Sequence, residues 1–413
     1  MHEEISIRKA RALGIAFIIF GFAVLALFLP GTAADQTTTF TFNLSSSEAI
    51  EIPPLTVGTR MALYFTALLS VALGMWQLAK GFKRVYLVLT FVSLLFVLAF
   101  LAWAAKGKSM NLTGMLQSTL LRAIPITLAG LSGVLCERSA VINIGIEGMM
   151  LAGAFVSALV GSVTQSYWWG LLAALLAGGL FGALLAVLAI RYKVDQIIAG
   201  TAINILATGL TSYFSSRYLQ VHQELNHPPT FQPISIPLLG NIPILGPIFF
   251  NHTLLVYVTL ILVVLIHIIL FYTRWGLRTR AVGEHPRAAD TLGINVFKVR
   301  YVNVIAGGIV AGLGGAYLVL SSVARFDELM TAGKGFIGLA AMIFGKWTPF
   351  GAFGASMIFG FADSLQTKLA ILSVPIPSQF LLMAPYLVTM IVLAGVVGQA
   401  NPPAADGQPY EKE

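Results

Sequence analysis

Uninterrupted apolar runs of close to 20 residues recur along most of this chain. That length is what a helix needs to cross the hydrocarbon core of a bilayer, which is about 30 Å thick. Of its 413 residues, 57% are hydrophobic and only 10% are charged, whereas a soluble domain carries roughly a quarter charged residues. Because helices satisfy their own backbone polar groups in lipid, we predict an all-α, polytopic helical membrane protein.

The apolar runs predict about twelve transmembrane segments. They lie at 12–29, 61–79, 85–105, 112–135, 141–162, 168–190, 196–219, 252–273, 301–322, 335–346, 350–368 and 379–398. The tenth is too short to cross alone in ideal form, so it is either a re-entrant or broken helix or a helix that extends into its flanks. We expect residues 1–111 to form an N-terminal extension with about three spans and an outer polar insertion, and residues 112–413 to form the core.

The distribution of basic residues predicts the orientation. With the N-terminus inside, the inner connections carry more than twice as many Lys and Arg residues as the outer ones. Cytoplasmic loops of membrane proteins show this bias. It explains the net charge of +8 without nucleic acid as a partner. We therefore expect both termini and the connection at 274–300 to be cytoplasmic.

The sequence carries no convincing catalytic arrangement. Its glycine-rich stretches lack the Lys-Ser or Lys-Thr ending of a phosphate-binding loop. The six histidines are scattered, away from metal-ligand spacing, and the single cysteine, Cys136, excludes an internal disulfide. We predict that the chain is not an enzyme and binds neither a cofactor nor a metal.

The connection at 274–300 has the features of a short helix with a defined beginning and end. Pro286 suits the first helical position, and Glu284 would lie near the positive end of the helix dipole. Residues 287–292 can make about two turns, and Gly293 can end them in a left-handed conformation. So short a helix is marginal alone. It is either a solvated loop or a rigid peg that fits a groove in an ATP-hydrolysing partner.

A second polar segment opens the fifth predicted span. Asn143 and Glu147 are four residues apart, on one face if the segment is helical, and Gly145 and Gly148 favour a broken or unwound start. Interrupted helices at membrane depth usually line a cavity, and an intramembrane carboxylate is a functional candidate by default. The alternative for Glu147 is burial in a helix–helix contact with hydrogen bonds to backbone.

Other polar features allow two interpretations each. Asn204 in the seventh span either joins helices or faces a hydrophilic pathway. Asp363 and Arg122 also lie within spans. The proline-rich outer segment 220–251 is either an ordered surface loop or a landing surface for a substrate-delivery protein. Paired glycines four residues apart, at 178 and 182 and at 308 and 312, indicate close helix packing.

Four separated segments, in order, resemble bacterial ABC-importer permeases of the branched-chain amino acid/ribose permease family. They are Val-Ile-Asn-Ile-Gly-Ile-Glu-Gly-Met-Met at 141–150, Val-Gly-Glu-His-Pro-Arg-Ala-Ala-Asp-Thr-Leu-Gly-Ile-Asn at 282–295, Ala-Gly-Leu-Gly-Gly-Ala-Tyr at 311–317 and Gly-Lys-Gly-Phe-Ile-Gly-Leu-Ala-Ala-Met-Ile-Phe-Gly-Lys-Trp at 333–347. Within this family the chain is most similar to the nucleoside (simple sugar) permease subunits. The resemblance covers roughly 112–398.

The resemblance implies partners and site residues. The partners are a second homologous permease, a cytoplasmic ABC ATPase that uses ATP and Mg²⁺, an extracellular lipid-anchored substrate-binding protein, and membrane lipid. The expected pathway residues are Asn143, Gly145, Glu147, Gly148 and Asn204. The expected ATPase-coupling residues are Gly283, Glu284, His285, Pro286, Arg287, Asp290 and Gly293.

We therefore expect the transmembrane permease subunit of an ATP-driven importer of nucleosides. A permease for a simple sugar such as ribose fits the same motifs. An ion-coupled secondary transporter would use an intramembrane acid such as Glu147 or Asp363, and a membrane-embedded scaffold would transport nothing.

Overall fold

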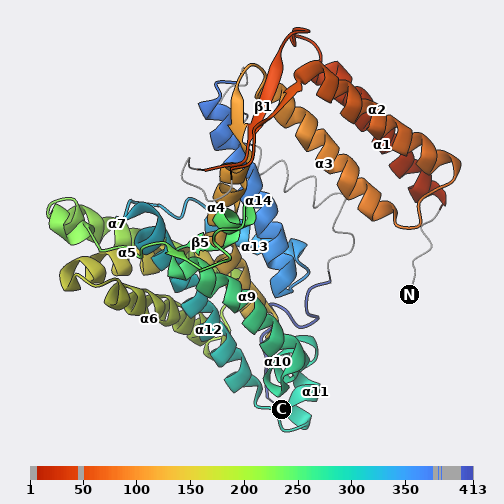
Figure 1. Ribbon diagram of the computed structural model, residues 1–413. Coiled ribbons are helices and arrows are strands. Elements are labelled where there is room, and N and C mark those ends of the chain that lie inside the picture. Colours follow the sequence, from red (N-terminus) through yellow and green to blue (C-terminus); the bar gives the residue numbers. More distant parts are fainter. Residues whose placement is uncertain (1–6, 45–50, 375–379, 381–382, 384–400, 413) are drawn as a thin grey trace. The chain divides into compact units, whose positions relative to one another are not determined.

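The computed structural model describes residues 7–44, 51–374, 380, 383 and 401–412 (Figure 1). The chain divides into two compact units, which are described separately. One comprises residues 1–115, 241–244 and 367–378, and the other comprises 116–240, 245–366 and 379–413. Apart from residues 380 and 383, the predicted span at 379–398 lies outside the described residues.

The first unit packs three apolar helices beside a small sheet. The helices are α1 (Ile7–Phe28), α2 (Thr59–Ala79) and α3 (Val85–Ala104). The strands β1 (Thr37–Thr41), β2 (Leu55–Gly58) and β3 (Ser109–Asn111) lie in the order β2-β1-β3, with β1 antiparallel to β2 and parallel to β3. The Thr-rich part of the insertion after the first span is therefore ordered as a strand, which the sequence analysis did not predict.

The second unit is a bundle of longer helices joined by short elements. In chain order they are α4 (Leu112–Glu137), α5 (Ile146–Thr164), α6 (Tyr167–Ala186), η1 (Val187–Arg191), α7 (Gln196–Phe214), η2 (Ser215–Leu219), η3 (Gln223–Asn226), β4 (Ile234–Ser235), α8 (Leu245–Phe249), β5 (Asn251–His252), α9 (Leu254–Tyr272), α10 (Arg274–Glu284), α11 (Pro286–Thr291), α12 (Val296–Tyr317), η4 (Leu318–Val323), α13 (Lys334–Phe344) and α14 (Pro349–Ile371). The elements η1, η2 and η4 are widened π-helical turns that continue α6, α7 and α12.

Nine helices among the described residues are long and apolar enough to cross a bilayer. They correspond to the first nine predicted spans. The predicted tenth span is α13, which has 11 residues, and this confirms that it is too short to cross as an ideal helix. The helix α14, with 23 residues, corresponds to the eleventh.

Helices α5, α6 and α12 form the tightest part of the second unit, and α6 lies alongside α12 (Figure 1). Glycines make this approach close. A Cβ atom built on Gly178 would lie 2.3 Å from the carbonyl oxygen of Gly308, and one on Gly312 would lie 2.3 Å from that of Ala174. On α5, Gly153 faces Gly312 in the same way. Small residues at such contacts bring helix backbones together in lipid, as the glycine spacing predicts.

We expect Gly178→Ala to destabilise the protein by about 1–3 kcal/mol, because the added methyl group overpacks the α6–α12 contact. The matched control is Gly209→Ala on α7, where a Cβ atom would have nothing within 4 Å. Thermal unfolding of the purified protein in detergent measures both. Equal midpoints for the two variants would show that the contact tolerates a larger residue.

Candidate functional site

The fifth predicted span begins with a break. Residues 141–145 are not helical, and α5 starts at Ile146 after the N-cap residue Gly145. The expectation of an unwound start is therefore confirmed. The shared face of Asn143 and Glu147 depended on a helical segment, and that condition is not met, because Asn143 precedes the first helical residue.

The break before α5 leaves backbone polar groups without partners in their own helix. The side chain of Asn204 on α7 forms hydrogen bonds with two of these groups. Its Nδ2 donates to the carbonyl oxygen of Ile144 at 2.9 Å, and its Oδ1 accepts from the amide of Gly148 at 2.8 Å. A Cβ atom on Gly148 would lie 2.9 Å from the Cα of Asn204, so only glycine allows this approach. Asn204 therefore acts as a helix cap provided by a neighbouring helix.

Asn143 is completely buried. Its Nδ2 lies 3.4 Å from the sulfur of Cys136 and 3.7 Å from that of Met149. Its Oδ1 has no hydrogen-bond partner among the described residues. Its place in a substrate pathway stays a prediction.

Glu147, in the first turn of α5, caps a second interrupted segment. Its Oε1 accepts from the amide of Gly333 at 2.8 Å and its Oε2 accepts from that of Gly335 at 2.6 Å. These amides lie at the N-terminus of α13, where the N-cap residue Gly333 has φ of +79° and no side chain to offer. A carboxylate is favoured there by the free N–H groups and the helix dipole.

Three further charged side chains lie near this cap. Arg122 on α4 donates to Asp363 on α14 at 2.6 Å. The charge of Lys334, at the start of α13, interacts with those of Asp363, Glu147 and Arg122. The sequence shows each residue but not the pairing, because Arg122 and Asp363 are 241 positions apart.

Helix α11 has the predicted beginning and end. His285 is the N-cap residue, Pro286 is the first helical residue, and Gly293 follows with φ of +80°. Glu284 is the last residue of α10 and directly precedes the N-cap of α11, and its Oε2 accepts from the amide of Ala404 at 3.1 Å. Its interaction with the dipole of α11 stays a prediction.

The seven expected coupling residues differ in exposure. Glu284, His285, Arg287 and Gly293 are exposed, Pro286 and Asp290 are half-buried, and Gly283 is buried. Gly283 packs closely, since a Cβ atom there would lie 2.4 Å from the carbonyl oxygen of Arg138. Leu292 is 82% exposed, which is unusual for a leucine without a partner surface. Their role in coupling stays a proposal.

Residues 401–412 pack against α10 and α11. The amide of Ala405 donates to the carbonyl oxygen of Gly283 at 3.0 Å. The hydroxyl of Tyr410 donates to Oδ2 of Asp290 at 2.8 Å, and its ring lies in an apolar cluster with Val282 and Ala289. The sequence analysis missed this contact. The available signal was the aromatic residue Tyr410 within an otherwise polar segment.

Asp406 is the half-buried acid of this segment. Its carboxyl group interacts with that of Glu137, at the end of α4. Burial raises the pKa of the Asp406 carboxyl from its ordinary 3.8 to about 6. Within the described residues, no group of three His, Cys, Asp or Glu side chains could hold a metal ion.

Comparison with known proteins adds the family. The profile described as "Branched-chain amino acid transport system / permease component" matches residues 115–397. The guanosine ABC transporter permease protein NupQ of Bacillus subtilis is 44% identical over 307 residues, which cover 71% of this chain and 95% of the relative. The nucleoside ABC transporter permease protein NupC of Lactococcus lactis is 40% identical over 322 residues, 73% of this chain and 99% of the relative.

A third relative is named for a different substrate. The putative glucose ABC transporter permease protein TsgC13 of Haloferax volcanii is 38% identical over 255 residues, 62% of this chain and 77% of the relative. No solved structure matches the chain.

We expect Asn204→Leu to lower stability by about 1–3 kcal/mol for each backbone group left unpaired, here the Gly148 amide and the Ile144 carbonyl. Thr201→Val is the control, because the exposed Thr201 hydroxyl bonds only its own helix, at the carbonyl of Ile197. Thermal unfolding compares the two variants. An unfolding midpoint for Asn204→Leu within error of the control would contradict the capping role.

The docked segment 401–412 should loosen as pH rises. A carboxyl whose pKa is raised on folding stabilises the folded form fully below its ordinary pKa, and that stability is lost as pH rises toward about 6. Amide exchange at Ala405, corrected for its intrinsic rate, should be roughly tenfold or more faster at pH 7 than at pH 5. Asp406→Asn should reduce the difference, and an unchanged difference in that variant would assign it to another group.

Proposed function

This chain belongs to the branched-chain amino acid transport system / permease component family, and we propose that it is the permease subunit of an ATP-driven importer of nucleosides. The observation that carries the substrate class is the 44% identity to a guanosine permease over 95% of that relative's length. The nucleoside permease matched over 99% of its length supports the same choice.

The chain is a multi-pass membrane protein of a family that supplies the membrane passage and is not itself catalytic. We propose that ATP and Mg²⁺ are used by a separate ABC ATPase. That subunit would contact the end of the second unit that carries α10 and α11, which places this end in the cytoplasm. The excess of basic residues in the predicted inner connections supports this orientation.

The exposed face of α11 is the proposed docking surface. Arg287 is exposed on the helix, and Leu292 is exposed directly after its last residue. On its other face, Ala289 is buried against Val296, at the start of α12. A push on α11 would therefore be transmitted directly to α12.

The residues expected along the pathway would act through the break before α5. Gly145 and Gly148 allow α7 to approach, Asn204 holds the broken end, and Glu147 joins it to α13. Movement of α5 would then move α13 with it. Asn143, buried beside Cys136, would support this arrangement.

Further partners belong to the same proposal. A second homologous permease would complete the passage, and a lipid-anchored binding protein would deliver substrate from outside. Residues 1–111 would be an extension added to the permease core at 112–413. In support, the family match begins at residue 115.

Two other transport functions have weaker support. A simple-sugar permease is supported by the 38% identity to a putative glucose permease, but over a smaller part of both chains. In an ion-coupled transporter Glu147 would bind the ion, yet both of its carboxylate oxygens already accept amides of α13.

The test is uptake by the complete assembly, purified with its ATPase and reconstituted in vesicles with the binding protein. Guanosine uptake should require ATP. Arg287→Ala combined with Leu292→Ala should lower uptake about tenfold or more while ATP hydrolysis continues, because a weakened docking contact of roughly 1.4 kcal/mol corresponds to tenfold. Lys298→Ala is the control, since it removes an exposed positive charge outside α11.

Each alternative gives a different result. Uptake driven by an ion gradient without ATP would support the secondary transporter. Uptake of glucose or ribose but of no nucleoside would overturn the substrate class. Unchanged coupling in the double variant would contradict the docking role of α11.

A further inference from the structure

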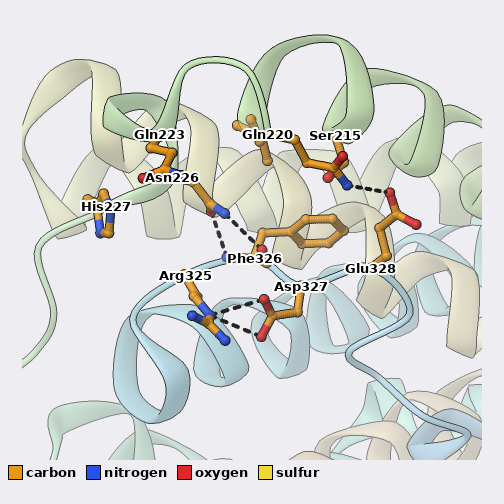
Figure 2. A pocket seen from close by; sticks show the side chains of 10 residues that line it. Ser215, Gln220, Gln223, Asn226, His227, Arg325, Phe326, Asp327 and Glu328 are labelled. Atoms are coloured by element: carbon orange, nitrogen blue, oxygen red, sulfur yellow. Dashed lines mark hydrogen bonds and ion pairs between the residues drawn. The ribbon is translucent and has the colours of Figure 1, made fainter.

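Two adjacent pockets lie at the end of α7 and α12 that is remote from α11. The first has a volume of about 330 Å³ and is lined mainly by polar side chains from η2, η3 and the segment after η4 (Figure 2). Pockets of a few hundred Å³ with a few placed polar groups are typical of small-molecule sites. Four of the lining residues (Gln220, Gln223, Asn226 and His227) lie in the segment 220–251, for which the sequence predicted a surface loop or a landing surface for a delivery protein, but no small-molecule site.

Internal bonds hold the walls of the polar pocket in place. Asn226 clamps the backbone of Phe326, accepting from its amide at 2.7 Å and donating to its carbonyl oxygen at 2.9 Å. Gln220 donates to Glu328 at 3.0 Å, as Figure 2 shows. The two chain segments that form the pocket are therefore fixed relative to each other before any ligand binds. Such preorganisation lowers the free-energy cost of binding.

Two polar side chains of this pocket are available to a ligand. Gln223 and His227 line it and make no side-chain hydrogen bond or ion pair within the part of the chain that the structure describes. An amide and an imidazole together offer both donors and acceptors. Sugar hydroxyl groups need this combination.

The second pocket is aromatic and apolar. It has a volume of about 340 Å³ and is lined by Phe155, Leu159, Phe214, Tyr218 and Leu225. The rings of Phe214 and Tyr218 are nearly parallel, with centroids 6.1 Å apart. Such ring faces can stack on a flat aromatic ligand.

The two pockets are neighbours because the same short elements line both. Tyr218 and Leu225 face the apolar pocket, while the next residues along the chain, Leu219 and Asn226, face the polar one. The ring of Phe326, in the polar pocket, meets that of Phe155 edge-on, with centroids 5.3 Å apart. A ligand with one flat apolar end and one hydroxylated end would reach both.

The local backbone in this region is also irregular. Both α7 and α12 end here in π-helical turns, η2 and η4. Such turns are rare and often occur at functional sites. Ser215 and Leu219 of η2 line the polar pocket directly.

We propose that the two pockets together bind the nucleoside where it enters the membrane passage, with the base against Phe214 and Tyr218 and the ribose against Gln223 and His227. This rests on the proposed function, which supplies the nucleoside class. A free sugar would occupy only the polar half, and a free base only the aromatic half. Preference for the whole nucleoside therefore follows from the pairing of the two pockets.

The first test compares transport of several substrates by the reconstituted assembly at saturating loaded binding protein. Tyr218→Leu keeps an apolar side chain but removes the stacking ring. It should reduce guanosine uptake by about tenfold, within the range for loss of one base–aromatic stack, and should reduce cytidine uptake less because the pyrimidine ring is smaller. The matched control is Tyr213→Leu, an exposed tyrosine on α7 that does not line either pocket.

Substrate dependence separates a binding role from a structural one. An equal loss for guanosine and cytidine, or no loss in Tyr218→Leu, would overturn the inference even though nucleoside uptake by the unaltered protein upholds the proposed function. Absence of nucleoside uptake by the unaltered protein would overturn both.

The second test does not depend on transport rates. The assembly, held without ATP, is irradiated with 8-azidoadenosine and the labelled peptides are identified. Label within 213–227 or 325–328 that is displaced by unlabelled guanosine, and is reduced by Gln223→Ala with His227→Ala, supports the site. Absence of label, label elsewhere, or label in these peptides that guanosine does not displace would overturn it.

Discussion

The structure depends most on how it satisfies backbone polar groups where a helix is interrupted inside an apolar bundle. In hydrocarbon an unpaired N–H or C=O costs several kcal/mol, so a break persists only with a partner. Here Asn204 pairs the broken start of α5, and Glu147 pairs the amides of α13. These few bonds connect α7, α5 and α13 in series and determine where α13 begins.

Glycine contacts complement these polar bonds. Gly178, Gly308 and Gly312 bring α6 and α12 into backbone contact, and Gly153 brings α5 against the same part of α12. Helix α12 is therefore packed between α5 and α6 along its middle. Helix α11 lies at one end of it, and the polar pocket lies beyond η4 at the other. Under the roles proposed above for α11 and the polar pocket, α12 is the element that joins them.

Periodicity and composition predicted what depends on local sequence. The first nine spans, the short α13 and the limits of α11 follow from apolar length, from Pro286 and from Gly293, and all agree with the structure. Features made by distant residues were not predictable. The capping of α13 by Glu147 joins residues 186 positions apart, and the contact of Tyr410 with Asp290 joins residues 120 apart. The break before α5 also follows from local sequence, since Gly145 and Gly148 predict an unwound start and α5 begins at Ile146.

The position of Tyr410 against Asp290 also has a consequence for biogenesis. Helices α12, α13 and α14 lie between α11 and residues 401–412 in the chain, so a ribosome makes all three before the contact can form. During synthesis, the side of α11 that residues 401–412 cover in the mature protein is therefore exposed. In the proposed docking role of α11, a nascent chain would present an incomplete surface to the ATPase subunit, and pairing of the two would be delayed until translation has passed the last of these helices.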